Sequence, residues 1–310
     1  MDLVHGLASL PFLDEASAVT IGFFDGVHLG HRAVFARTVE VARERGLRSV
    51  AVTFDRHPRE ILTPGQEPRL LTTTERKARL IEETEIETLL VLEFTEGLSR
   101  VPAEDFLRDV LVGGVHARHA VVGGNFTFGY KAAGTLATLR EAEGMTAEGV
   151  GLLELEGRRV SSSSIREALA EGDLAWPRLA LGRRFVLDGE VIGGAGRGHG
   201  LGFPTANLRT RPRLLLPGNG IYAGTATVGA GRHLAAISVG TNPTFGVEPL
   251  HVEAYLLDFD GDLLGEHIAI EFWERLRDEE RFDSSKELVK AIDEDVERTR
   301  AIVRADAPST

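Results

Sequence analysis

The sequence predicts two folds in one chain: an α/β domain with a parallel sheet, then an antiparallel, Greek-key-like β-barrel with a C-terminal helix. In the first half, strand-like and helix-like stretches alternate, which is typical of a parallel sheet with helices on its faces. In the second half, short stretches alternate apolar and polar residues, and 17 of the 35 glycines lie between Gly182 and Gly265. We therefore expect one domain over residues 1–180 and a second over residues 181–310.

Apolar periodicity and helix-capping residues predict the elements of the α/β half. Strands are expected at Ala18–Phe24, Ser49–Phe54, Thr88–Leu92 and Ala120–Val122. Helices are expected at His31–Gly46, from a capping box of Thr72 and Glu75 to about Glu83, and from Pro102 to about Val112. A last capping box, Ser164 with Glu167, begins a helix near the end of this half.

The barrel half is predicted from short alternating stretches separated by Gly, Pro and Asn. These stretches are Phe185–Ile192, Gly220–Val228, His233–Val239, His251–Phe259 and His267–Phe272. Ser284 and Glu287 form a capping box for a final helix to about Arg304. The spacing of the five alternating stretches suggests a closed or nearly closed barrel.

Composition excludes several classes of protein. The 310 residues include no cysteine, so a disulfide framework, a thiolate nucleophile and a cysteine zinc site are excluded. No apolar run approaches the roughly 18 residues of a membrane helix. The net charge of −12, without a Lys/Arg run, argues against nucleic-acid binding. We expect a cytoplasmic protein whose partners are small molecules, with neither nucleic acid nor membrane among them.

The most informative motif is GFFDGVHLGH at Gly22–His31, which follows a predicted strand and begins a predicted helix. Gly26 and Gly30 allow a polyphosphate to approach the backbone, where a helix N-terminus offers N–H groups. His28 and His31 share a face of the first turn and could stabilise charge developing on a phosphorus atom. The alternatives are a plain strand–turn–helix with incidental histidines, or a metal-binding histidine pair.

Two further segments of the first half carry polar side chains that suit a ligand. Asn125 follows the predicted strand Ala120–Val122 and could offer its amide at the carboxyl edge of the sheet, although a simple turn would also explain it. Hydroxyl groups at Ser161–Arg166 lead into a helix; capping explains Ser164 but leaves Arg166 unexplained.

In the second half, a glycine-rich loop precedes the tetrapeptide PTAN at Pro204–Asn207. Such a loop exposes N–H groups that suit phosphates, although a flexible connection is an equal alternative. No Walker A spacing occurs. The side-chain oxygens of Thr205 and Asn207 could hold Mg²⁺ and a phosphate, or could belong to an ordinary turn. Glu253 lies on a predicted strand with His251 and Tyr255 on the same face, where a solvent-facing acid would also be ordinary.

The first half resembles the nucleotidylyltransferase superfamily through H-x-G-H, and prokaryotic FAD synthetase through FDGVH before it. TFDRHPREIL (Thr53–Leu62), VVGGNFTFG (Val121–Gly129) and VSSSSIR (Val160–Arg166) follow in the family's order. The resemblance implies a Rossmann-like nucleotidylyltransferase domain in which His28 and His31 are catalytic. It also implies that nucleotide and phosphate are bound by Gly22, Phe24, Asp25, Gly26, Gly30, Asn125, Ser162, Ser163 and Arg166.

Three positions depart from the family's pattern. Phe23 stands where Asn is frequent, Arg56 where Pro is frequent, and Ser163 where Thr is common. The first two could alter the flavin or ATP pocket, whereas Ser163 keeps the hydroxyl group.

The second half resembles riboflavin kinase. PTAN is followed by GIYAG (Gly220–Gly224), VGTNPTFG (Val239–Gly246) and HVEAYLLDF (His251–Phe259). The resemblance implies that Glu253 is the base that activates the ribityl hydroxyl of riboflavin. It further implies Mg²⁺ binding by Thr205 and Asn207, and nucleotide binding by Gly196, Gly198, Gly202, Thr205 and Asn207.

Together the two resemblances imply a bifunctional enzyme of FAD biosynthesis. The second domain phosphorylates riboflavin to FMN, and the first adenylylates FMN to FAD with release of pyrophosphate. ATP is the co-substrate and Mg²⁺ the metal, while FMN and FAD are substrates or products rather than prosthetic groups. A monomer or weak homo-oligomer is expected. Two alternatives remain: one retained activity, or a non-catalytic regulator that binds flavin or nucleotide.

Overall fold

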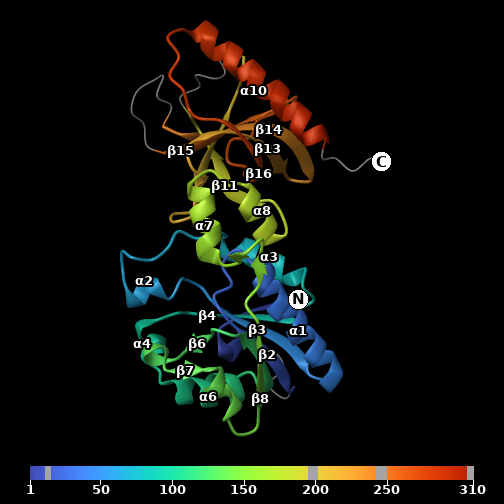
Figure 1. Cartoon of the computed structure of the whole chain (residues 1–310), viewed down its shortest axis with the longest axis vertical. Coiled ribbons are helices and arrows are strands. Elements are labelled where there is room, and N and C mark those ends of the chain that lie inside the picture. Colours follow the sequence, from blue (N-terminus) through green and yellow to red (C-terminus); the bar gives the residue numbers. More distant parts are fainter. Residues whose placement is uncertain (11–14, 195–201, 242–249, 306–310) are drawn as a thin grey trace. The chain divides into compact units, whose positions relative to one another are not determined.

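The computed structural model describes residues 1–10, 15–194, 202–241 and 250–305. The chain divides into two compact units, Met1–Ser162 and Ser163–Thr310 (Figure 1). The helices α7 (Ser162–Ala170) and α8 (Ala175–Leu181) belong largely to the second unit, whereas the sequence places both in the first domain. The domain boundary near residue 180 stays a prediction.

The first unit is built on a six-stranded parallel sheet with strand order β1-β4-β3-β2-β5-β8. The strands are β1 (Asp2–His5), β2 (Ser17–Ile21), β3 (Arg48–Phe54), β4 (Thr88–Leu92), β5 (Ala117–Gly123) and β8 (Thr146–Val150). From β2 the chain crosses to β3 on one side, while β5 pairs with β2 on the other. Open parallel sheets bind ligands at such a reversal of strand order, beyond the carboxyl ends of the strands.

Helices cover both faces of this sheet. On one face, α1 (Leu29–Arg45) and α3 (Thr74–Glu82) pack on strand residues such as Ala51 and Leu89. The other face packs on α5 (Ala103–Asp105), the π-helix η2 (Phe106–Val112) and α6 (Leu136–Arg140). Burial on both faces explains why the central strands β2, β3 and β4 read as mainly apolar runs.

The remaining elements of this unit are short. They are η1 (Leu7–Ser9), α2 (Arg59–Leu62), α4 (Glu96–Ser99), β6 (Thr127–Phe128), η3 (Tyr130–Ala132), β7 (Gly134–Thr135), β9 (Glu154–Leu155) and β10 (Arg158–Arg159).

Several expected boundaries in this unit were wrong. The strand expected to reach Phe24 ends at Ile21, because Phe24 and Val27 adopt positive φ angles of 54° and 42° that no strand allows. The cap of α3 is Thr73, whose side chain accepts from Arg76, because Thr72 bonds to the loop after β2 instead.

The expected capping box at Ser164 was also wrong. Helix α7 starts earlier, at Ser162, so that Ser164 lies within its first turn. The Ser164 hydroxyl accepts a hydrogen bond from the indole of Trp176 on α8 at 3.3 Å.

The second unit contains a closed six-stranded barrel of order β11-β12-β15-β14-β13-β16, which confirms the predicted antiparallel barrel (Figure 1). Its strands are β11 (Val186–Ile192), β12 (Ala206–Thr210), β13 (Gly220–Val228), β14 (Gly231–Gly240), β15 (His251–Leu256) and β16 (His267–Arg277). The expected C-terminal helix is present as α10 (Ser285–Ala305), and it packs on β13, β14 and β16. Ser284 accepts from the Glu287 N–H at 3.3 Å, as a cap should.

Strand β12 was missed, because Pro204–Asn207 was interpreted as a turn. The structure instead places Ala206 and Asn207 in a strand that pairs with β11 and β15. Within the described ranges, no helix is long and apolar enough to cross a membrane.

Candidate active sites

The motif Gly22–His31 lies beyond the carboxyl end of β2 and leads into α1. His28 is the N-cap of α1, and its Nδ1 accepts a hydrogen bond from the His31 N–H at 3.3 Å. In the neutral ring, Nε2 therefore carries the proton and can donate it in a hydrogen bond. The His28 and His31 rings are stacked with centroids 3.6 Å apart, so the two predicted catalytic side chains do lie together.

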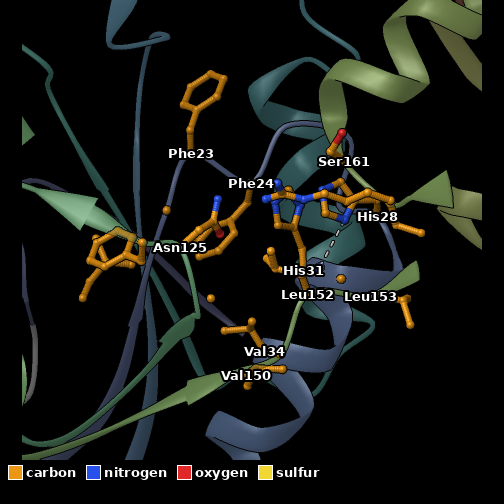
Figure 2. A pocket seen from close by; sticks show the side chains of 18 of the residues that line it. Phe23, Phe24, His28, His31, Val34, Asn125, Val150, Leu152, Leu153 and Ser161 are labelled. Carbon is orange, nitrogen blue, oxygen red and sulfur yellow. Dashed lines mark hydrogen bonds between the residues drawn. The ribbon is translucent and has the colours of Figure 1, made fainter. Parts of the chain in front are cut away.

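A cavity of about 330 Å³ opens between the ends of β2 and β5. Figure 2 shows His28 and His31 on it, with Asn125 coming from the segment after β5. The predicted residues that line this cavity are Gly22, Phe24, His28, Gly30, His31 and Asn125. The two segments chosen from the sequence thus meet at the edge where a parallel sheet binds ligands.

Two glycines of this motif lie close to neighbouring rings. A Cβ at Gly22 would lie 2.7 Å from the ring of Phe24, and one at Gly30 would lie 3.1 Å from the ring of His28. Phe24 itself is buried against Phe35 and meets the His31 ring edge-on at 5.3 Å. Phe24 thus both lines the cavity and supports one of its histidines.

Asp25 and Gly26 hold the shape of the loop in this structure. The Asp25 carboxylate is 3% exposed and accepts from the Leu71 N–H at 3.0 Å and from the Thr72 N–H at 3.2 Å. Gly26, at φ 79°, donates its N–H to the Thr72 hydroxyl at 3.3 Å. These bonds connect the loop between β2 and α1 (residues 22–28, called the histidine loop below) to the segment before α3. A nucleotide-binding role for Asp25 or Gly26 stays a prediction.

The serines of the third motif have different surroundings. Ser162 donates its hydroxyl to the Asp25 carbonyl at 2.9 Å, and its neighbour Ser161 lines the cavity. Ser163 is exposed and Arg166 is half-buried on α7. Nucleotide binding by Ser162, Ser163 and Arg166 stays a prediction.

Sequence reasoning did not select two residues of this unit that have a place in the site. Arg159 lines the cavity and could offer a guanidinium to a phosphate, but the short strand that carries it has no recognisable motif. Lys77 donates a hydrogen bond to the carbonyl of Phe23, in the loop between β2 and α1, at 3.0 Å. Lys77 precedes Leu80 and Ile81 by three and four residues, so it lies on the apolar face of α3. A charged residue on such a face is the sequence feature that could have identified it.

In the second unit, β12 and β15 bring the predicted kinase residues together. Asn207 stands directly opposite Glu253 in the sheet, and the Thr205 hydroxyl donates to Glu253 Oε2 at 2.9 Å. His251 Nε2 lies 3.2 Å from Glu253 Oε1, and both side chains are 22% exposed. Glu253 is therefore held at both oxygens rather than extended into solvent.

Strand alternation places this cluster on the outer face of the barrel wall. Val252, Ala254 and Leu256 are buried, whereas His251, Glu253 and Tyr255 are half-buried and share one face, as the sequence predicted of that face. The chain before β12 passes closely over Asn207, because a Cβ at Gly194 would lie 2.1 Å from its Nδ2.

The rest of the glycine-rich loop is only partly described. Gly202 adopts φ 87°, which suits glycine. Gly196 and Gly198, and most of the predicted segment Val239–Gly246, lie outside the described residues. In the described ranges, no group of three or more His, Cys, Asp or Glu side chains is arranged to hold a metal ion.

Comparisons with known proteins support the same division of the chain. The FAD synthetase family model matches residues 11–164, and the riboflavin kinase family model matches residues 181–303. A bifunctional riboflavin kinase/FMN adenylyltransferase of Pseudomonas fluorescens is 36% identical over 311 residues, covering 99% of each chain. This chain belongs to the bifunctional riboflavin kinase/FMN adenylyltransferase family.

Other members of the family are similar over nearly the same length. The relative from Bacillus subtilis is 35% identical, with 90% of each chain covered, and that from Escherichia coli K12 is 33% identical, with 94% covered. A crystal structure described as a macrolide-efflux protein from Streptococcus pneumoniae is 28% identical. It superposes with a TM-score of 0.86 and covers 97% of this chain and 99% of its own.

Proposed function

We propose that this chain makes FAD from riboflavin in two ATP-dependent steps, each catalysed at its own site. The observation that carries the proposal is that both predicted sets of reactive side chains are assembled. His28, His31 and Asn125 surround one cavity in the first unit. Thr205, Asn207 and Glu253 form one cluster in the second.

The kinase step is assigned to the cluster around Glu253. The ribityl hydroxyl of riboflavin attacks the γ-phosphorus of ATP, its proton passes to the Glu253 carboxylate, and ADP leaves. Thr205 and His251 hold the two carboxylate oxygens, which fixes the direction in which Glu253 accepts the proton. A base held in this way typically contributes about 10²–10⁴-fold to the rate.

The donors at this cluster fit Mg²⁺. The Thr205 hydroxyl and the Asn207 amide supply oxygen atoms beside the Glu253 carboxylate, and Mg²⁺ binds oxygen ligands. Mg²⁺ bound there with the ATP phosphates would supply charge neutralisation at the transferred phosphoryl group. We accordingly propose Thr205 and Asn207 as its protein ligands.

The adenylyl transfer is assigned to the cavity of the first unit. A phosphate oxygen of FMN attacks the α-phosphorus of ATP, and pyrophosphate leaves, so no covalent enzyme intermediate is required. His28 Nε2–H and the adjacent His31 ring are positioned to stabilise charge on the phosphate as it develops. The remaining catalysis comes from holding the two substrates in line.

We propose that the enzyme works in the cytoplasm as a monomer or weak homo-oligomer on small molecules alone. Size-exclusion chromatography with light scattering at micromolar concentration tests the oligomeric state.

Chromatography of a reaction containing riboflavin, ATP and Mg²⁺ tests the two activities. FMN should appear first and then decline as FAD accumulates. FMN that accumulates without FAD would leave only the kinase, and FAD formed only from added FMN would leave only the adenylyltransferase. Flavin binding without either product would favour the non-catalytic regulator.

A further inference from the structure

Lys77 on α3 is buried behind the histidine loop of the first unit. Its side chain is 2% exposed, and it does not line the cavity. A lysine that neither reaches solvent nor lines the cavity requires another reason for its burial, because removing an ammonium group from water is costly.

The reason is visible in the hydrogen bonds of its ammonium group. Nζ lies 3.0 Å from the Phe23 carbonyl oxygen, 3.0 Å from the Thr53 hydroxyl and 3.3 Å from the Phe54 carbonyl oxygen. An ammonium group has three N–H donors, so each donor of Lys77 has one of these acceptors. Lys77 thus joins the segment after β2 to the last two residues of β3.

Phe23 completes this arrangement. Its ring lies 4.2 Å from Nζ in a cation–π contact and meets the His57 ring edge-on at 4.9 Å. Figure 2 shows the Phe23 ring pointing away from His28 and His31. Both the carbonyl and the ring of Phe23, a residue that lines the cavity, are therefore in contact with the Lys77 ammonium group.

We propose that Lys77 is a positioning residue for adenylyl transfer, whose ammonium group fixes the start of the histidine loop at Phe23. The inference rests on the proposed function of this site. Two residues after Phe23, Asp25 anchors the same loop to the Leu71 and Thr72 N–H groups. The loop that leads to His28 is thus fixed at two successive points. At the first, the Thr53 hydroxyl also donates to the Phe23 carbonyl at 3.1 Å, so without Lys77 this carbonyl keeps one hydrogen bond but loses its contact with the ammonium group.

The charge on Lys77 is sensitive to alkaline pH. Burial lowers its pKa to about 8, while the charges of Asp25 and Asp55 act in the opposite direction. The other ionisable groups here are Arg56, which pairs with Asp55, and His57 beside Phe23. Deprotonation leaves two N–H donors for three acceptors, so the anchor weakens as pH rises through about 8.

Replacing the ammonium group tests the inference. In Lys77→Met, kcat for FAD formation from FMN should fall about 10–100-fold, as expected when reacting groups shift by roughly 1 Å. The KM values for FMN and ATP should change less than kcat does, because Lys77 itself does not line the cavity and reaches it only through Phe23, which does. Riboflavin phosphorylation by the same protein should stay within about twofold of wild type. Arg79→Met, on the exposed face of α3, is the matched control and should change neither activity.

A pH profile separates positioning from a general loss of stability. FAD formation by wild type should fall as pH rises through about 8, relative to riboflavin phosphorylation measured on the same protein. Lys77→Arg keeps a permanent charge, so its activity, though reduced, should lack this alkaline fall. This comparison remains decisive if Lys77→Met fails to fold.

The possible results separate two failures. Wild-type protein that makes no FAD from FMN contradicts the proposed function itself. Wild-type protein that makes FAD, together with unaltered kcat in Lys77→Met or an unchanged alkaline fall in Lys77→Arg, overturns the role of Lys77 alone.

Discussion

The two candidate sites, both proposed to catalyse transfer at phosphorus, are built on different supports. In the first unit, the reactive histidines stand on a loop beyond a strand end, with Phe24 and Val27 in left-handed conformations. In the second, Asn207 and Glu253 stand opposite each other on paired strands. Sheet register positions a strand residue directly, whereas a loop requires additional anchors, which Asp25 and Lys77 provide from buried positions.

The largest loss of activity is expected on replacing Glu253, the proposed base on strand β15. In Glu253→Gln, riboflavin phosphorylation should fall about 10²–10⁴-fold, since the amide keeps the shape but accepts no proton. FAD formation from added FMN should be unchanged. Chromatographic rates measure both, with Glu266→Gln on an exposed position of the same unit as control. A kinase rate within threefold of wild type would remove Glu253 from the site.

The corresponding change in the first unit is the double variant His28→Ala/His31→Ala. FAD formation from FMN should fall at least about 10²-fold, the loss typical when one transition-state donor is removed. Riboflavin phosphorylation should continue at the wild-type rate. The exposed His5→Ala is the control. Equal losses of both activities would contradict the assignment of one reaction to each unit.

Adding a methyl group at Gly194 tests whether the position of Asn207 matters for the kinase step. In Gly194→Ala, the new methyl group would have to displace Asn207, and we expect the kinase rate to fall at least about tenfold. Gly193→Ala is a closely matched control, because a Cβ there meets nothing within 4 Å. If the two substitutions had equal effects, the Asn207 contact would not explain the loss.

The smallest effect concerns stability rather than catalysis. His119 is buried beside Thr146, and burial lowers its pKa. In the unfolded chain its pKa is about 6.5, so below that pH the unfolded state gains a proton that the folded state resists. Stability from this residue is thus present above pH 6.5 and is lost on acidification. Thermal melting at pH 7.5 and 5.5 should show a smaller fall in Tm for His119→Asn than for wild type. An equal fall would assign the acid sensitivity to other groups.

The sequence was informative wherever one short motif contained the chemistry. The strand–turn–helix pattern located His28 and His31, and strand alternation placed Glu253 on the half-buried face of β15. Both depend on local periodicity, which sequence reports directly.

Features that depend on tertiary contacts could not be predicted in this way. Thr72 rather than Thr73 was expected to cap α3, because nothing in the sequence shows that Thr72 bonds to Asp25. Strand β12 is recognised by its pairing with β11 and β15, not by its five residues alone. The contact between Gly194 and Asn207 likewise requires the folded loop.

We propose that two independent sites in one chain carry out successive reactions. Mixing Glu253→Gln with His28→Ala/His31→Ala in riboflavin, ATP and Mg²⁺ tests it most directly. Neither variant alone should convert riboflavin to FAD, but the mixture should, because FMN made by the histidine variant is adenylylated by the other. A mixture that accumulates FMN without FAD, or a single variant that makes neither product from its own substrate, would contradict the account.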